Sequence, residues 1–224
     1  MVREWPVRLD GRWLEGVVEK LADSRPLFHS EADLQHALAW ELHRSHPEAV
    51  VRLELRPDPA LRESVDLVVV VDGCKVFIEL KYLVRRLDLT VGGERVVLRD
   101  QGAQSLSRYD VLKDVARLER FCVGAHIGFA VVLANDPLVW GPSRPGGVDS
   151  AFKIHDGALV SGTMEWAEHT GLGSRRGREA PITLRGSYRM SWRSWPASVP
   201  ELRESFRYLI VEVARRADLP RSIP

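Results

Sequence analysis

The apolar residues at the start of the chain recur every three to four positions, which is the spacing of an amphipathic helix. Residues 11–23 are expected to form one such helix, which ends before Pro26. A second helix is expected to begin at Ser30, because Ser30 and Asp33 resemble a capping box, and to end before Pro47. This pattern predicts two helices, each with one apolar side.

From Val50 the apolar period changes from 3.6 to 2, which predicts β-strands. The strand-like runs are residues 50–56, 65–71, 75–83 and 127–134. The last of them is almost continuously apolar, as a central strand buried on both faces would be. Residues 103–121 return to the helical period. The order helix, three strands, helix, strand predicts an α/β fold with a mixed β-sheet flanked by helices over about residues 27–136.

The rest of the chain has a weaker pattern. Strands are expected near Asp156-Gly157 and over Tyr188–Trp192, whereas residues 206–213 fit either a strand or a helix. We interpret residues 137–224 as a C-terminal elaboration, so that residues 1–224 form a single domain.

The composition is that of a globular protein, with 45% hydrophobic and 28% charged residues among 224 and a formal net charge of +1. It excludes disordered and fibrous chains. No apolar run approaches the ~20 residues of a membrane span, and early charges such as Arg3 and Glu4 argue against a signal peptide, so no membrane partner is expected. Cys74 and Cys122 are too few for a disulfide framework and favour a reducing, cytoplasmic location.

Two glycine-containing dipeptides predict hairpins. Asp72-Gly73 lies between two apolar runs, which is the strongest short-range hairpin signal. With a two-residue turn Val71 faces Cys74, and the residue numbers of every opposed pair add up to 145. Gly92-Gly93 indicates a second, weaker hairpin.

The first hairpin places Asp66 opposite Glu79, and opposed residues share a face with Cβ atoms about 4.5–5.5 Å apart. Lys81 projects from the same face, since it is two residues beyond Glu79. Neighbours such as Val68 and Phe77 offer these carboxylates little solvation, so their repulsion is costly. A divalent cation would remove that cost, and Mg²⁺ is usually held by one or two carboxylates, waters and substrate phosphate. The register therefore predicts a magnesium site.

Asp66, twelve intervening residues and then Glu79-Leu80-Lys81 resemble the signature of the PD-(D/E)xK nuclease superfamily. The helices before and after the strands are similar to the αβββαβ core of that restriction-endonuclease-like fold, and the resemblance covers about residues 27–136. The proline that names the motif is absent, because Ser64-Val65 precede Asp66.

This resemblance implies a role for each residue of the motif. Asp66, Glu79 and the backbone carbonyl of Leu80 would bind Mg²⁺, for which Mn²⁺ would substitute, and Lys81 would orient or deprotonate the attacking water. Glu31 would join the catalytic and metal site, as a glutamate on this helix does in part of the superfamily. The alternative for Glu31 is a favourable interaction with the helix dipole.

The helix that follows the strands supplies two secondary candidates. Superfamily members often place a glutamine or a lysine of this helix near the site, which implies Gln104 and Lys113. Surface ion pairs on an amphipathic helix are the alternative explanation.

A basic region follows Leu172, with Trp192 and Trp195 among its arginines. Arginine binds phosphates, and aromatic rings can stack on bases. The residues expected to bind nucleic acid are Arg175, Arg176, Arg178, Arg189 and Arg193. A solvated loop with tryptophans in the core is the other interpretation.

Together these expectations describe a cytoplasmic, Mg²⁺-dependent nuclease that hydrolyses phosphodiester bonds, with DNA as the expected substrate, and cutting both strands would suit a homodimer. One alternative is a catalytically silent nucleic-acid-binding or regulatory module on the same fold. Another is a hydrolase that uses Asp66 and Glu79 as acid and base without a metal.

Overall fold

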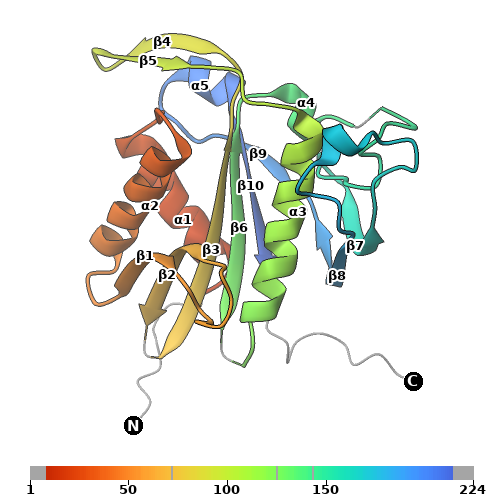
Figure 1. Ribbon diagram of the computed structural model, residues 1–224. Helices are drawn as coiled ribbons and strands as arrows, with labels where there is room; N and C mark the ends of the chain where they lie inside the picture. The colour runs from red at the N-terminus through yellow and green to blue at the C-terminus, as the bar shows by residue number, and fades with distance from the viewer. Residues whose placement is uncertain (1–8, 72, 125, 143, 214–224) are drawn as a thin grey trace.

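The computed structural model describes residues 9–71, 73–124, 126–142 and 144–213 (Figure 1). Its helices are α1 (Gly11–Ser24), α2 (Glu31–Ser45), α3 (Gln104–Phe121), α4 (Pro137–Trp140), the 3₁₀ turn η1 (Leu172–Arg175) and α5 (Pro200–Ser205). Its strands are β1 (Val50–Leu55), β2 (Val65–Val71), β3 (Cys74–Leu83), β4 (Leu87–Val91), β5 (Glu94–Leu98), β6 (Ile127–Ala134), β7 (Leu159–Met164), β8 (Ile182–Arg189), β9 (Trp192–Ser194) and β10 (Arg207–Val213).

Six strands form one mixed sheet in the order β1-β2-β3-β6-β10-β9. β3 and β6 are parallel and the other neighbouring pairs are antiparallel. Helices flank the sheet on both faces, with α1 and α2 on one and α3 on the other (Figure 1). The mixed α/β class expected from the sequence is therefore confirmed.

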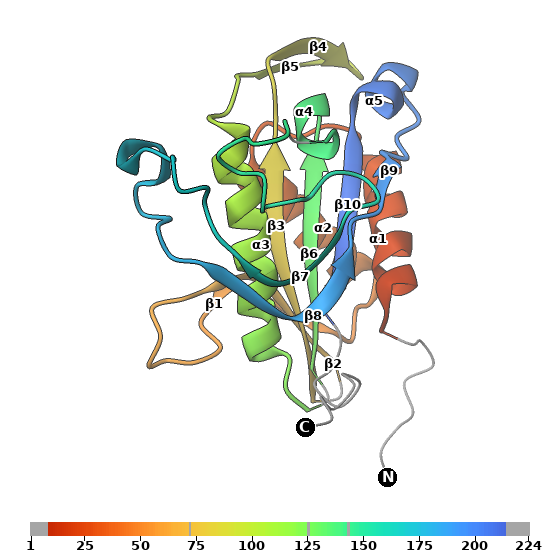
Figure 2. The same ribbon diagram turned by 90° about the vertical axis from the view of Figure 1, so that its right-hand side faces the viewer.

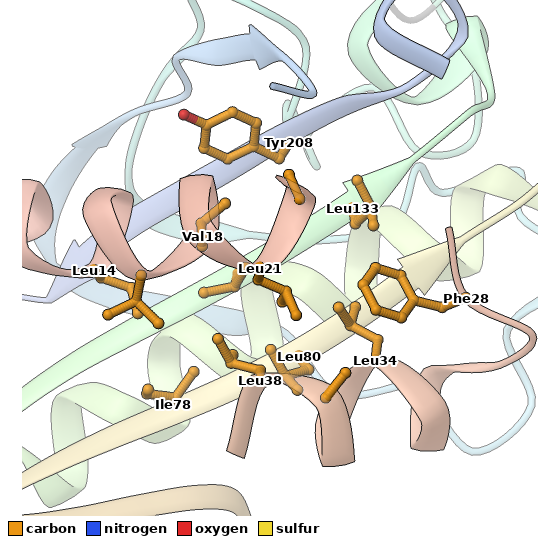
Figure 3. Packing of buried hydrophobic residues seen from close by; sticks show 14 of the residues in the cluster. Leu14, Val18, Leu21, Phe28, Leu34, Leu38, Ile78, Leu80, Leu133 and Tyr208 are labelled. Atoms are coloured by element: carbon orange, nitrogen blue, oxygen red, sulfur yellow. The ribbon is translucent and has the colours of Figure 1, made fainter. Parts of the chain in front are cut away.

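The first two helices begin and pack as their sequences predict. The Ser30 side chain caps α2 by accepting a hydrogen bond from the Asp33 amide at 3.1 Å, and Asp10 caps α1 in the same way. Their apolar sides pack against the sheet. Figure 3 shows Leu14 and Leu21 of α1 and Leu34 and Leu38 of α2 together with Ile78 and Leu80 of β3. Hydrophobic burial of this kind holds α1 and α2 on the sheet.

The other face has a separate core. Val68 and Phe77 point to this side, where they join Leu112 and Val115 of α3. All eight residues of β6 are buried, as expected for a central strand. Beyond α3, the paired strands β7 and β8 extend this layer (Figure 2). Side chains of β3 therefore alternate between two cores.

The β2–β3 register agrees with the prediction, since the pairs run from Val71 with Cys74 to Leu67 with Ile78. Gly73 has a φ of 80°, a left-handed conformation that suits the turn, while Asp72 lies outside the described residues. The second predicted hairpin is β4–β5, in which Gly92 and Gly93 both have positive φ, as a tight hairpin turn requires. This hairpin lies at the end of the sheet near α5 (Figures 1 and 2).

The C-terminal region adds strands to the main sheet. Residues 207–213 form β10, which lies between β6 and β9, so the segment that fitted either element is a strand. The strand expected near Asp156-Gly157 is β7, which begins at Leu159 just after a turn at these two residues, where Gly157 has a φ of 78°. Among the described residues, no helix is long and apolar enough to cross a membrane.

Candidate active site

Asp66 lies where β2 separates from β3. The paired residues end at Leu67 and Ile78, one step before Asp66 and Glu79 would pair. The next amide of β3 on this edge, that of Leu80, donates to Asp66 Oδ2 at 2.6 Å. A side chain thus replaces the strand hydrogen bond, and the Asp66 carboxylate is fixed beside Glu79.

Glu31 satisfies the following amide on the same edge of β3. Its Oε2 accepts a hydrogen bond from the Tyr82 amide at 2.8 Å. Alternate residues of a strand present their amides to the same edge, so Leu80 and Tyr82 are equivalent positions. Because Glu31 is the first residue of α2, this contact ties the start of that helix to the site. It also gives Glu31 a structural role that needs no cation.

Helix α3 contributes two site residues that the sequence did not single out, Asp114 and Arg117. Lys81 Nζ is 2.7 Å from Asp114 Oδ2 and donates to the Leu80 carbonyl at 2.9 Å. Arg117 forms an ion pair with Glu79 Oε2 and contacts Asp114 Oδ1 at 3.0 Å. The cluster therefore joins α2, β2, β3 and α3.

The cluster is acidic, and two of its carboxylates, those of Glu79 and Asp114, are buried. Four carboxylates, those of Glu31, Asp66, Glu79 and Asp114, face two cationic side chains, so the group carries two excess negative charges when fully ionised. Glu79 is only 1% exposed, and its Oε1 is buried without a hydrogen-bond partner. An unsatisfied buried carboxylate oxygen is costly and needs a reason in the structure.

Burial shifts the acid–base behaviour of the cluster. Desolvation and the Asp114 charge raise the pKa of Glu79 to about 9, although Arg117 opposes the shift. Desolvation also raises the pKa of Asp66 and of Glu31, although each accepts a backbone hydrogen bond. Burial alone would lower the pKa of Lys81, but Asp114 and Glu31 outweigh it, so the net shift is upward. Shifted values of this kind are common at functional sites.

Glu54 of β1 has an unusual backbone beside Asp66. Its φ of 50° is the one positive value recorded for a non-glycine residue in the described part of the chain. Gln35 donates to Glu54 Oε1 at 2.9 Å and to the Asp66 carbonyl at 2.8 Å, while Ser64 donates to Glu54 Oε2 at 2.9 Å. Strained residues of this kind cluster at functional sites. Glu54 and Gln35 were not predicted, because backbone strain leaves no clear mark in a sequence.

The two secondary candidates on α3 lie outside the cluster. Gln104 donates to Asp136 Oδ2 at 2.9 Å and so ties the start of α3 to α4. It precedes Asp114 by ten residues, about 15 Å along a helix. Lys113 is exposed and makes no hydrogen bond or ion pair within the described ranges. The face of α3 that meets the site carries Asp114 and Arg117 instead.

Three of the predicted nucleic-acid-binding arginines are engaged within the fold. Arg178 makes two hydrogen bonds of 2.7 Å to Asp110 of α3. Arg193 pairs with Glu15 at 2.7 Å, and Arg189 donates to the Gly157 carbonyl at 3.2 Å. Arg178 and Arg193 thus have structural partners that a phosphate would have to displace.

The remaining basic residues and the two tryptophans differ in exposure. Arg176 is exposed and Arg175 is half-buried. Trp192 and Trp195 are core residues whose indole N–H groups donate to the carbonyls of Ile154 and Pro26. The expectation that these rings are available to stack on bases is therefore wrong, because both are packed inside the protein.

The donor set of the cluster fits a small divalent cation. Mg²⁺ prefers oxygen ligands and needs only one or two carboxylates, because water and substrate phosphate complete its shell. Asp66, Glu79 and the excess negative charge meet this requirement. Within the described ranges, however, no three His, Cys, Asp or Glu side chains are arranged to hold a metal ion together. The expected arrangement with Glu31 as an additional ligand is therefore absent from this conformation, in which Glu31 holds the Tyr82 amide.

Comparisons with protein-family models, with curated proteins and with solved structures found no match to this chain.

Proposed function

We propose that this chain is a metal-dependent nuclease that hydrolyses phosphodiester bonds, with DNA as its substrate. The observation that carries the proposal is the convergence of Asp66, Glu79 and Lys81 in one partly buried acidic cluster at the point where β2 leaves β3. The order of α2, β1, β2, β3, α3 and β6 agrees with the restriction-endonuclease-like core that the motif implies. The choice of DNA rests on that resemblance.

Asp66 and Glu79 are the residues proposed to hold Mg²⁺, with the Leu80 carbonyl beside them. A bound divalent cation would polarise the phosphate and lower the pKa of an attacking water. Lys81 remains protonated, because its pKa is shifted upward by Asp114 and Glu31. It therefore acts in this proposal as a fixed positive charge that orients water and stabilises the developing phosphate charge, and not as the base.

The basic segment that Arg178 ties to α3 supports contact with a phosphate backbone. Asp110 and Asp114 are one turn apart on α3, about 6 Å along the helix, so they lie on the same side. Since Arg178 is held by Asp110, the segment that carries Arg175 and Arg176 is anchored near the cluster. We propose Arg176 as the first phosphate contact of this segment, because its side chain is exposed.

A second candidate is a catalytically silent nucleic-acid-binding module. It is favoured by the fact that the ionisable groups of the cluster have protein partners, including Asp66 with the Leu80 amide and Lys81 with Asp114. Such contacts could maintain the fold without any reaction. Among the described residues, Cys74 and Cys122 form no disulfide, which suits the cytoplasmic location that we propose under either function.

Cleavage assays on matched proteins separate these functions. Purified protein is incubated with duplex DNA, single-stranded DNA, branched DNA and RNA, with Mg²⁺, Mn²⁺ or EDTA. We expect Mg²⁺-dependent cleavage that falls by at least about a thousandfold in Lys81→Ala, while circular dichroism shows the native fold. Binding without metal-dependent turnover would instead identify the silent module, and cleavage that survives EDTA would identify a metal-free hydrolase.

A further inference from the structure

Both candidate cation ligands on β3 already face a positive side chain. The Arg117 guanidinium contacts Glu79 Oε2, and Lys81 Nζ donates to the Leu80 carbonyl at 2.9 Å. A divalent cation that binds Glu79 and the Leu80 carbonyl must therefore compete with protein cations for the same oxygens.

Asp114 is placed to hold both of these cations at once. Its Oδ1 is 3.0 Å from Arg117 Nη2, and its Oδ2 is 2.7 Å from Lys81 Nζ. Arg117 can consequently release Glu79 and still keep one carboxylate partner on its own helix. Asp114 is buried, so this pairing is only weakly screened by solvent.

The contacts of Arg117 are incomplete for a residue with a purely structural role. Its Nε is buried without a hydrogen-bond partner, and so is Glu79 Oε1 at the other end of the ion pair. Buried polar groups in a permanent structural ion pair are normally satisfied. Each partner of the Glu79–Arg117 ion pair therefore keeps one buried polar atom that the ion pair does not use.

We propose that Arg117 is a counter-ion of the cation site. In the metal-free protein it pairs with Glu79. When a divalent cation binds, Arg117 releases the Glu79 carboxylate and its guanidinium stays paired with Asp114. This inference rests on the proposed function, since it assumes a cation site at Asp66 and Glu79.

Removal of the Arg117 charge is expected to strengthen cation binding. A divalent ion gains about twice as much as a proton does when a nearby positive charge is removed, because the interaction scales with the product of the charges. Binding of the metal is therefore favoured even though Glu79 also holds its proton more tightly. We expect Arg117→Gln to lower the Kd for Mn²⁺ by about tenfold or more.

The test is a titration with Mn²⁺ alone, followed by the electron paramagnetic resonance signal of the free ion. Wild type, Arg117→Gln and Arg117→Lys are compared with Arg120→Gln, a matched control. Arg120 is on the same helix and loses the same charge, but its partner is Glu63 and not Glu79. Arg117→Lys keeps the charge, so its Kd should stay within about threefold of wild type. Arg117→Met is a second neutral variant, used if Arg117→Gln does not fold, and the same decrease in Kd is expected from it.

Four outcomes overturn the inference. An unchanged or weaker Mn²⁺ affinity in the neutral variants would show that Arg117 does not compete with the cation. If Arg117→Gln and Arg120→Gln increased the Mn²⁺ affinity equally, the effect would come from the overall charge of α3. If Arg117→Gln and Arg117→Lys increased it equally, side-chain size and not charge would be responsible. If neither wild type nor the variants bind Mn²⁺, the cation site itself is absent and the proposed function fails with it.

Discussion

At the scale of single residues, carboxylates of the site satisfy backbone amides, and one of them, Asp66, is also a proposed cation ligand. Asp66 accepts the Leu80 amide where the β2–β3 ladder ends, and Glu31 accepts the Tyr82 amide. Each of these hydrogen bonds needs an acceptor oxygen but does not need the negative charge of the carboxylate. Substitutions that keep the hydrogen bond but remove the charge can distinguish structural from chemical roles.

Asp66 offers such a pair of substitutions. Asp66→Asn can still accept the Leu80 amide through its side-chain carbonyl, so we expect nearly unchanged stability and at least about a hundredfold loss of Mg²⁺-dependent cleavage. Asp66→Ala leaves that amide unpaired and should cost about 1–3 kcal/mol of folding free energy in addition. Urea denaturation and the cleavage assay measure the two effects. Wild-type cleavage by Asp66→Asn would remove Asp66 from the mechanism.

Glu79 predicts how the stability of the metal-free protein depends on pH. Its pKa is raised to about 9 in the folded protein, so between its ordinary range and pH 9 the folded state binds the proton that the unfolded state has lost. This contribution is fully present below about pH 4.5 and is lost as the pH rises toward 9, by up to about 1.4 kcal/mol per pH unit. Denaturation in EDTA at several pH values should show this decline, and Glu79→Gln should flatten it. Parallel curves for the two proteins would mean that Glu79 is not the group responsible.

At the scale of elements, the sequence predicted those features that depend on local pattern. The helical period of α1 and α2, the Ser30 cap and the register set by the turn at Gly73 follow from side chains close in sequence. The contribution of α3 depends on which of its faces meets β3. The family resemblance implies Lys113, but it is the neighbouring Asp114 that faces the site. The apolar residues around Asp114 were the available signal, because a carboxylate on a buried helix face requires a partner.

Glu119 shows how α3 also fixes the C-terminal layer. Its buried carboxylate accepts hydrogen bonds from the amides of Arg185 and Gly186 and from the Tyr188 hydroxyl. Glu119→Ala leaves these β8 donors unpaired and should destabilise the protein by about 3 kcal/mol or more, whereas Tyr188→Phe should cost about 1 kcal/mol. Thermal and urea denaturation measure both changes. A loss below about 1 kcal/mol in Glu119→Ala would show that β8 is held mainly by other contacts.

At the scale of the whole molecule, the sheet separates two cores, and the acidic cluster joins elements from both sides of it. Glu31 reaches the cluster from the helix layer that contains Leu34, whereas Asp114 reaches it from the layer that contains Val115. The mixed α/β class was predictable from the order in which segments of helical and of strand periodicity follow one another in the sequence. The position of β10 beside β6 and the burial of Trp192 and Trp195 were not, since they depend on contacts between distant parts of the chain.

The most direct measurement of the central claim is anomalous diffraction from crystals of the full chain grown with Mn²⁺. We predict an anomalous peak between the carboxylates of Asp66 and Glu79, with oxygen ligands about 2.0–2.3 Å away, and no such peak in crystals of Asp66→Asn. The crystals are grown at a Mn²⁺ concentration that supports cleavage by magnesium-dependent nucleases. The account would be contradicted by a structure in which the Glu79–Arg117 ion pair is intact and no anomalous peak lies at the two carboxylates.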